Sequence, residues 1–422
     1  MMALKLRPCT SWLRTVGSTL VLMIGSLCLL FATSLAHSQT FAVLHAFKGR
    51  GDGKFPTVGV IRDSAGNLYG TTNRGGALDM GTLFRLDTNG NEIILHNFWG
   101  GDGLGPGELM RTHSGTLFGT TGDGGTAKGG GCQYGCGTVF KLDTADKHKV
   151  LYIFKGGGDG SGPWGPLVRD AEGNFYGATE YGGDLSCGQL PPPGCGVVFR
   201  VDTSGKETVL YTFTGGDDGG FPTGGVIRDD AGNLYGAAGV GGTFGSGVIF
   251  RLDPAGHETV LYNFTGYSDG GGPWGPLLRD SAGNLYGTTF YGGYSRYSGG
   301  VVFMLDTGGG ETVLHDFGGG NDGWAPDGGL VRDRKGNLFG TTGYGGSNGC
   351  NVDGCGIAFK VDVNGNETIL HVFTGKSDGQ YPNARLTLDE SGNIYGTAAF
   401  GGDSSCGDLH GLGCGVVFKI TP

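Results

Sequence analysis

Aromatic residues gather at one kind of loop in this sequence, a D-G-x-x-P segment that recurs seven times. An aromatic residue stands in or beside it in six copies, namely Phe55, Trp164, Phe221, Trp274, Trp324 and Tyr381. Flat rings can stack on a sugar or a peptide, while nearby carboxylate and amide groups orient it. We therefore predict a ligand-binding surface made of Trp164, Trp274, Trp324, Tyr381, Glu108, Asp327 and Asn383.

The same rings could instead pack one structural unit against the next. We favour packing for Phe55 and Phe221, and both roles stay open for the three tryptophans. Further aromatic residues follow the second strand of several repeats, namely Tyr181, Phe290, Tyr291, Tyr344 and Phe400. The expected ligand is an extracellular glycan or protein.

Acid–base catalysis at this surface would need two carboxyl groups at a suitable separation, as in glycosidases. Six carboxyl groups could approach it, those of Glu108, Glu180, Asp184, Asp327, Asp403 and Asp408. Their spacing does not bring any two together, so we assign no catalytic residue. A binding or scaffold module is the leading hypothesis, and an enzyme of the lyase or glycoside hydrolase type is the alternative.

The histidines argue against a metal ion or a Ser-His-Asp triad at this surface. Four of them occupy a strand position that is tyrosine in three other repeats, which predicts packing. These are His45, His96, His315 and His371, and the tyrosines are Tyr152, Tyr211 and Tyr262. His113, His148 and His257 are expected in turns on the opposite face, which leaves His410 alone. We predict no metal ion and no cofactor.

Eight cysteines form four local pairs, each between the second and third strands of a repeat. The pairs are Cys132 with Cys136, Cys187 with Cys195, Cys350 with Cys355, and Cys406 with Cys414. The repeats with a pair have longer loops than those without. Zinc binding by pairs in neighbouring repeats is the alternative, but an exported chain favours disulfides.

A seven-fold repeat must position all of these residues. The pentapeptide GNLYG and its variants begin at Gly66, Gly115, Gly173, Gly232, Gly283, Gly336 and Gly392, a period of 49 to 59 residues. Each period contains four short apolar and β-branched runs separated by Asp and Gly turns, which predicts four antiparallel strands. Glycine makes up 94 of 422 residues, and its periodic placement indicates order rather than disorder.

These strands predict an all-β fold, a seven-bladed β-propeller of four-stranded antiparallel blades. The expected blades cover residues 56–98, 106–154, 163–213, 222–264, 273–317, 326–373 and 382–420. The repeated unit consists of GNLYGTT, then GG, then GTVF and ETVLxxF. It resembles the Gloeobacter and Verrucomicrobia β-propeller repeat over about residues 41 to 420. It is more distantly similar to the NHL-type repeat. The resemblance implies a secreted or surface-displayed propeller and implies no particular chemistry.

Four recurring charged positions are expected to serve the blade itself. An aspartate in the first turn of six repeats and another in the second turn of six repeats are predicted to accept backbone hydrogen bonds. The seven aspartates of D-G-x-x-P could suggest calcium, but we favour turn capping, because calcium needs six or more converging oxygens. An arginine at the end of the first strand, such as Arg169, is predicted to pair with the second-turn aspartate of its own blade.

The two ends of the repeat region are expected to meet. The last repeat stops at GVVFKITP without a fourth strand, and residues 40–47, TFAVLHAF, match the fourth strands of the other repeats. We predict that this segment pairs with the last third strand and closes the ring, which removes an exposed edge. The predicted propeller domain thus covers residues 37–422.

Residues 1–36 contain basic residues, an apolar run and a small-residue site at Ala36, which indicates a secretory signal peptide. A retained membrane anchor is the alternative. The chain carries a net charge of −10, which disfavours a nucleic-acid partner. We expect a secreted, periplasmic or cell-surface monomer without a membrane span after signal cleavage.

Overall fold

The computed structural model describes residues 39–49, 51–126, 131–188, 191–295, 298–346, 349–350, 353–406 and 411–422. The predicted signal peptide, Asp408 and His410 lie outside these residues. Regular structure in the described part is β-strand, apart from the 3₁₀ turn η1 (Gly320–Asp322). None of the described residues forms a helix long and apolar enough to cross a membrane.

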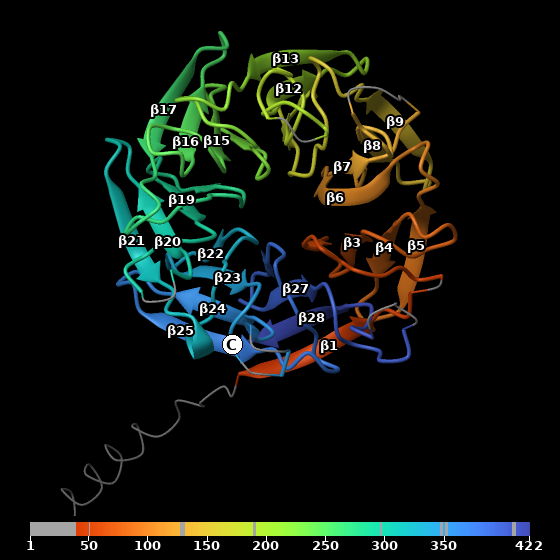
Figure 1. The fold of residues 1–422 in the computed structure, drawn as a ribbon. Helices are drawn as coiled ribbons and strands as arrows, with labels where there is room; N and C mark the ends of the chain where they lie inside the picture. Colours follow the sequence, from red (N-terminus) through yellow and green to blue (C-terminus); the bar gives the residue numbers. More distant parts are fainter. Residues whose placement is uncertain are drawn as a thin grey trace, which may run out of the picture. The chain divides into compact units, whose positions relative to one another are not determined.

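Seven four-stranded antiparallel sheets follow one another around a ring (Figure 1). Blade 1 contains β2 (Ile61–Arg62), β3 (Leu68–Thr72), β4 (Thr82–Leu86) and β5 (Glu92–Asn97). Blade 2 contains β6 (Leu104–Arg111), β7 (Leu117–Asp123), β8 (Thr138–Leu142) and β9 (His148–Ile153). Blade 3 contains β10 (Val168–Arg169), β11 (Phe175–Thr179), β12 (Val197–Val201) and β13 (Glu207–Thr212). The predicted seven-bladed propeller is confirmed.

The remaining blades repeat this order. Blade 4 contains β14 (Val226–Arg228), β15 (Leu234–Ala238), β16 (Val248–Leu252) and β17 (Glu258–Asn263). Blade 5 contains β18 (Leu278–Arg279), β19 (Leu285–Thr288), β20 (Val301–Leu305) and β21 (Glu311–Asp316). Blade 6 contains β22 (Val331–Arg332), β23 (Leu338–Thr342), β24 (Ile357–Val361) and β25 (Glu367–Val372). Blade 7 contains β26 (Thr387–Leu388), β27 (Ile394–Ala398), β28 (Val416–Thr421) and β1 (Thr40–Ala46).

Blade 7 joins the two ends of the described chain. Strand β1 pairs antiparallel with β28, from Thr40 opposite Thr421 to Ala46 opposite Val416. The two strands lie side by side at the lower edge of the ring (Figure 1). The predicted closure of the ring by the N-terminal strand is therefore confirmed.

Two glycines of the repeated pentapeptide have different structural roles. Gly66 lies in the first turn with a φ of 94°, in the left-handed region that other residues rarely adopt. Gly70 lies in β3, where an added Cβ would stand 2.5 Å from Cζ of the buried Phe84. The first glycine thus permits the turn, and the second makes room for the aromatic core of the blade.

A repeated pair of phenylalanines packs each blade against the next. Phe98 follows the fourth strand of blade 1 and meets Phe140 of blade 2 edge to face, with ring centroids 5.3 Å apart. Equivalent pairs occur at the other six junctions, namely Phe154–Phe199, Phe213–Phe250, Phe264–Phe303, Phe317–Phe359, Phe373–Phe418 and Phe47–Phe84. The rings are fully buried, so apolar burial holds neighbouring blades together.

The aspartates of the turns behave as predicted. Asp63 accepts a hydrogen bond from the backbone N–H of Asn67 at 2.8 Å, and Asp87 accepts one from Asn91 at 2.9 Å. In the D-G-x-x-P loops the carboxylate accepts a backbone N–H from the end of the fourth strand, as Asp159 does from Lys155 at 3.0 Å. Turn capping is confirmed as the shared role of these aspartates.

All four predicted disulfides are present, joining Cys132 to Cys136, Cys187 to Cys195, Cys350 to Cys355, and Cys406 to Cys414. Three of them pack beside the loop that follows the fourth strand. A Cβ added at Gly215 would lie 2.4 Å from Sγ of Cys187, for example. Each disulfide therefore holds a long loop of the blade in a fixed conformation.

Five of the recurring arginines contact the preceding blade, whereas Arg169 lies over Phe175 of its own blade. Neither contact is with a second-turn aspartate, so the predicted ion pair within the blade is wrong. The guanidinium of Arg279 lies 5.5 Å from the ring centroid of Tyr235 in the preceding blade. The same contact joins Arg62 to Tyr395, Arg111 to Tyr69, Arg228 to Tyr176 and Arg332 to Tyr286. The reason is the packing of blades face to face, which places the first strand of one blade against the second strand of the previous one.

Replacement of Arg279 by alanine is expected to lower the free energy of unfolding by about 1 kcal/mol, because an exposed cation–π contact is lost. The measurement is urea denaturation of the parent and the variant. Arg334→Ala, which removes another exposed arginine, is the control and should leave stability unchanged. Equal losses in the two variants would contradict a specific contact with Tyr235.

Candidate functional site

Two sets of loops meet on one face of the propeller, which we call the upper face. Isolated β-bridges join the D-G-x-x-P loop to the segment after the second strand within a blade. The bridged pairs are Lys54–Arg74, Ser161–Tyr181, Gly220–Val240, Gly271–Tyr291, Trp324–Tyr344 and Gln380–Phe400. The predicted aromatic residues of both segments therefore lie on the same face.

Five aromatic rings form a continuous series across blades 6, 7 and 1, which we call the aromatic arc. Trp324 stacks on Tyr344 with centroids 4.2 Å apart, and Tyr344 meets Tyr381 edge to face at 5.1 Å. Phe400 lies 6.3 Å from Tyr381 and 5.3 Å from Phe55. All five side chains are partly exposed, so the arc offers ring surface to a ligand.

Two polar side chains beside the arc have unused hydrogen-bonding capacity. Oδ1 of Asp327 and Oδ1 of Asn383 are both buried without a hydrogen-bond partner. Burial raises the pKa of Asp327 to about 7. The pKa of Tyr381 is raised mainly by burial and secondly by the charge of Asp327. Buried polar atoms without partners are rare because they are costly, so these two are candidates for ligand contacts.

Trp164 and Trp274 pack against the preceding blade. A Cβ added at Gly122 would lie 2.2 Å from the six-membered ring of Trp164, and one at Gly239 would lie 2.4 Å from that of Trp274. Gly122 lies near the end of β7 and Gly239 directly follows β15, so both are at the end of the second strand of the preceding blade. The alternative packing role is therefore present for these two tryptophans, whose role in binding stays a prediction.

A second group of polar residues surrounds Trp164. Burial raises the pKa of Glu180, whereas hydrogen bonds from Tyr181 and Trp164 lower it. The charge of Asp123 adds to the increase. Burial also raises the pKa of Asp123, an effect that the charge of Arg74 opposes. Asp123 thus lies close enough to raise the proton affinity of Glu180. The sequence analysis named Glu180 but missed Asp123, because only the packing of blade 3 on blade 2 brings them together.

Glu108 lies apart from the aromatic arc, in a cavity of about 570 Å³ on the axis of the propeller. The first strands of all seven blades line this cavity, mostly with apolar side chains such as Ile61, Ile227 and Val331. Burial raises the pKa of Glu108, and the positive charge of Arg385 opposes this shift. The predicted site residues therefore occupy two regions, the upper face and the axial cavity.

The other predicted carboxylates stabilise their own loops. Asp184 accepts hydrogen bonds from Ser186, and Asp403 accepts them from Ser405. Neither is joined to a second carboxyl group by these contacts. Of the carboxylates named from the sequence, Asp327, Glu180 and Glu108 combine burial with a raised pKa, which is typical of functional groups. The first two lie on the upper face.

One histidine lies elsewhere than predicted. His148 is the first residue of strand β9 rather than part of a turn. Its ring stacks on that of His96, with centroids 3.9 Å apart and an angle of 5° between the planes. The histidine pair between blades 1 and 2 was not predicted, since a histidine pair was excluded only at the aromatic surface. It was missed because it joins two blades, whereas the sequence was compared within one repeat.

Comparison with known families identifies the repeat. The model of the Gloeobacter/Verrucomicrobia repeat matches residues 28–191 and 191–410. The chain belongs to the Gloeobacter/Verrucomicrobia repeat family. This membership confirms the resemblance seen in the GNLYG units. No curated protein matches the sequence.

Solved structures similar to this family member are β-propellers with very different sequences. The structure of streptogramin B lyase has a TM-score of 0.59 and 12% identity, and the match covers 91% of this chain and 97% of that one. The extracellular domain of a B. thetaiotaomicron protein assigned to the one component systems has a TM-score of 0.54 and 14% identity. That match covers 91% of this chain and 42% of the other. Such neighbours show the fold alone, and they include both an enzyme and an extracellular domain.

Proposed function

We propose that this propeller is an exported binding module that holds a carbohydrate chain on its upper face, across the aromatic arc. The observation that carries the proposal is the unbroken series of partly exposed rings from Trp324 to Phe55. Sugar rings stack on aromatic faces, and successive rings suit a ligand with successive units. Asp327 and Asn383, which are partly exposed, supply further polar groups for its hydroxyls.

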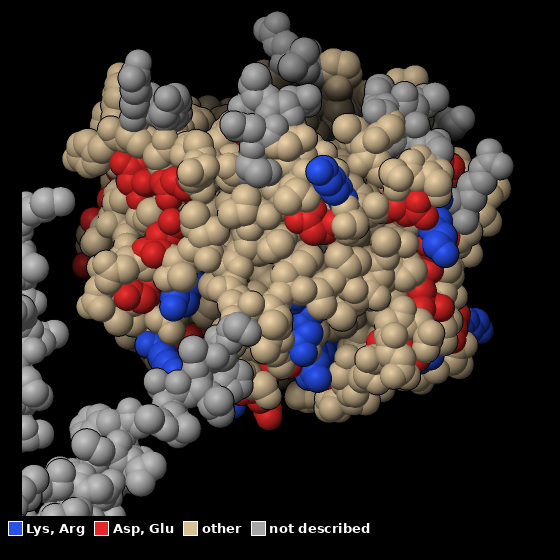
Figure 2. Space-filling view, turned by 90° about the horizontal axis from the view of Figure 1, so that it is seen from below, with Lys and Arg blue, Asp and Glu red and all other residues tan. Residues whose placement is uncertain are grey.

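Export is supported by the four disulfides, since such bonds persist in oxidising compartments. The net charge of −10 disfavours a polyanionic ligand. Figure 2, which views the rim of the ring from the side of β1 and β28, shows acidic and basic side chains there in small separate groups. A polyanionic ligand would need a continuous basic surface, so a neutral glycan fits better than a charged polymer.

An enzyme that uses Asp123 and Glu180 is the second candidate. Glu180 has the raised pKa that a general acid requires, and its cause is burial together with the nearby Asp123. Glycoside hydrolysis uses two such carboxyl groups with unequal proton affinities. This candidate and the binding module differ in the fate of the ligand, which only the enzyme would cleave.

Replacement of Trp324 or Tyr381 by alanine is expected to weaken glycan binding by about 10- to 100-fold, as for an aromatic residue at the centre of an interface. The ligand is first found on a glycan array with the mature protein. Affinities of the variants are then measured by calorimetry, and the bound glycan is analysed after long incubation.

Tyr267→Ala is the matched control, because Tyr267 is 78% exposed and outside the arc. It should bind as the parent does. Unchanged affinity in both arc variants would contradict the proposed surface. Cleaved glycan after incubation would favour the enzyme, and Glu180→Gln would then abolish the cleavage.

A further inference from the structure

Each junction between blades contains the same three positions. A ring at the fourth strand of one blade, His or Tyr, meets the capping aspartate of the next loop. Both lie near the residue that begins the fourth strand of the following blade. For Tyr152, the phenol donates to Asp159 at 2.8 Å, and Glu207 follows in blade 3, where its pKa is raised by burial and then by Asp159.

The third position varies in an informative way. It is glutamate at five junctions, namely Glu92, Glu207, Glu258, Glu311 and Glu367. At the junction of blades 6 and 7 it is Phe41, which stacks on His371. At the junction of blades 1 and 2 it is His148, so this junction alone among the seven has two imidazoles and one carboxylate.

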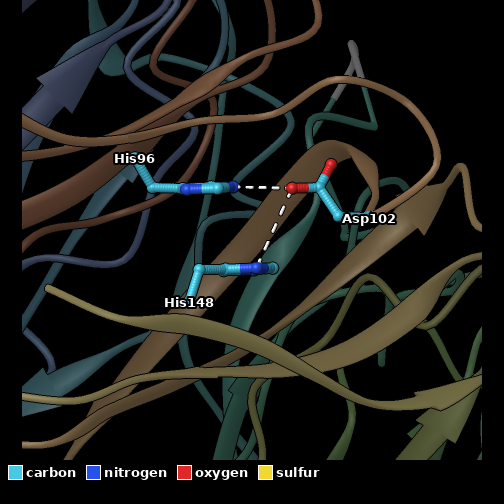
Figure 3. Close-up of side chains that lie close together, drawn as sticks. All are labelled: His96, Asp102 and His148. Atoms are coloured by element: carbon cyan, nitrogen blue, oxygen red, sulfur yellow. Dashed lines mark hydrogen bonds and ion pairs between the residues drawn. The ribbon is translucent and has the colours of Figure 1, made fainter.

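The geometry at this junction brings three ligand atoms together (Figure 3). Nε2 of His96 lies 2.7 Å from Oδ2 of Asp102, and Nδ1 of His148 lies 3.8 Å from the same oxygen. Figure 3 shows the two rings one above the other, with the carboxylate at the same end of both. Ligand atoms of a tetrahedral zinc ion lie about 3.3 Å apart, given bonds of about 2.0–2.1 Å. The observed distances bracket that value.

The surroundings favour a further occupant. The side chains of Asp102 and His148 are 6% and 9% exposed, and that of His96 is 19% exposed. Oδ1 of Asp102 accepts the backbone N–H of Trp99 at 2.9 Å, which holds the carboxylate in place. The loop from Phe98 to Asp102 is one residue shorter than its counterparts, so this junction differs from the others in its backbone as well.

We propose that His96, Asp102 and His148 bind one divalent transition-metal ion of the zinc class between blades 1 and 2. Two imidazoles and a carboxylate are ligands that such ions accept, and three protein ligands leave a position for water. His96 and His148 lie on the fourth strands β5 and β9, and Asp102 lies in the loop that follows β5, all away from the aromatic arc. It links two blades through the side chains of both, so metal binding is expected to stabilise the junction.

Titration of the full-length protein with Zn²⁺, and with Co²⁺ followed by its absorption spectrum, tests the site near pH 7.5. One ion per chain is expected. His148→Glu installs the residue found at five other junctions, so it should fold normally and bind at least about 100-fold more weakly. Zinc should also raise the melting temperature of the parent and not that of the variant.

The reciprocal variant provides an independent check at another junction. Glu367→His places a second imidazole beside His315 and Asp322, whose facing atoms are 3.2 Å apart. This variant is expected to bind two ions. Absence of binding in the parent, equal binding by His148→Glu, or a single ion in Glu367→His would each overturn the proposal.

Discussion

Deletion of residues 40–47 is expected to lower the free energy of unfolding by more than about 5 kcal/mol. The deletion removes Phe47, which is fully buried against Phe84 of blade 1, and loss of such a ring alone costs about 3–5 kcal/mol. It also removes the six residue pairs between β1 and β28. The last blade would then present an open edge.

The contribution of this strand is concentrated in residues that contact both neighbours. Phe41 stacks on His371 of blade 6 with centroids 3.7 Å apart, while Phe47 packs on blade 1. Strand β1 therefore joins blade 7 to the blades on either side. A terminal segment with loose contacts would not have this effect.

Thermal and urea denaturation of the deletion variant measure the effect. Two point variants separate core packing from strand loss. Phe47→Ala should destabilise by about 3–5 kcal/mol, whereas Val43→Ala should change stability little because Val43 is 37% exposed. A deletion variant with the parent's melting temperature would show that the ring closes without β1.

Stability is also expected to fall as the pH rises from 5 to 9, because five glutamates at the junctions have raised pKa values. Burial, followed by the nearby capping aspartate, raises the pKa of Glu92 to about 8 and that of Glu207, Glu258 and Glu311 to about 7. Burial and Asp322 raise the pKa of Glu367 to about 8. One carboxyl group of each Asp–Glu pair thus keeps its proton in the folded state.

The direction follows from the difference between the folded and unfolded states. The ordinary pKa of glutamate is 4.5, so the unfolded chain releases these protons before the folded chain does. Their contribution to stability is full below pH 4.5 and is lost as the pH rises through 7 to 8. After allowance for solvent screening, ionisation of each of these glutamates is expected to lower the free energy of unfolding by about 1 kcal/mol. The five together would lower it by several kcal/mol.

The turn aspartates have the opposite effect at low pH. Hydrogen bonds from Asn91 lower the pKa of Asp87, for example, so the stability that it contributes is lost as the pH falls below 3.8. The melting temperature should therefore be highest in mildly acidic solution. Melting curves from pH 3 to pH 9 measure this profile.

The triple variant Glu207→Gln, Glu258→Gln and Glu311→Gln should melt at a higher temperature than the parent at pH 9 and show a flatter profile. Glutamine keeps the shape of the protonated side chain without its ionisation. Glu390→Gln, at an exposed position, is the control and should follow the parent at every pH. A parent protein whose stability does not change between pH 5 and 9 would contradict the prediction that these glutamates keep their protons in the folded state.

Features that depend on neighbouring residues in the chain were predictable from the sequence. The turn aspartates, the disulfides in long loops and the number of strands all rest on contacts within one repeat, and seven copies make the pattern plain. Closure was predictable as well, because TFAVLHAF matches a strand that the last repeat lacks. Part of the aromatic arc was also named in advance, since Trp324 and Tyr381 stand in the D-G-x-x-P loops.

Contacts between blades were decided by the tertiary structure alone. The sequence determined the seven blades, their turns and their closing strand, because these follow from short-range periodicity. It could not show that Arg279 lies over Tyr235, that Asp123 approaches Glu180, or that His96 and His148 share Asp102. Each of these pairs joins different repeats, so the partners meet only through the rotation and face-to-face packing of neighbouring blades.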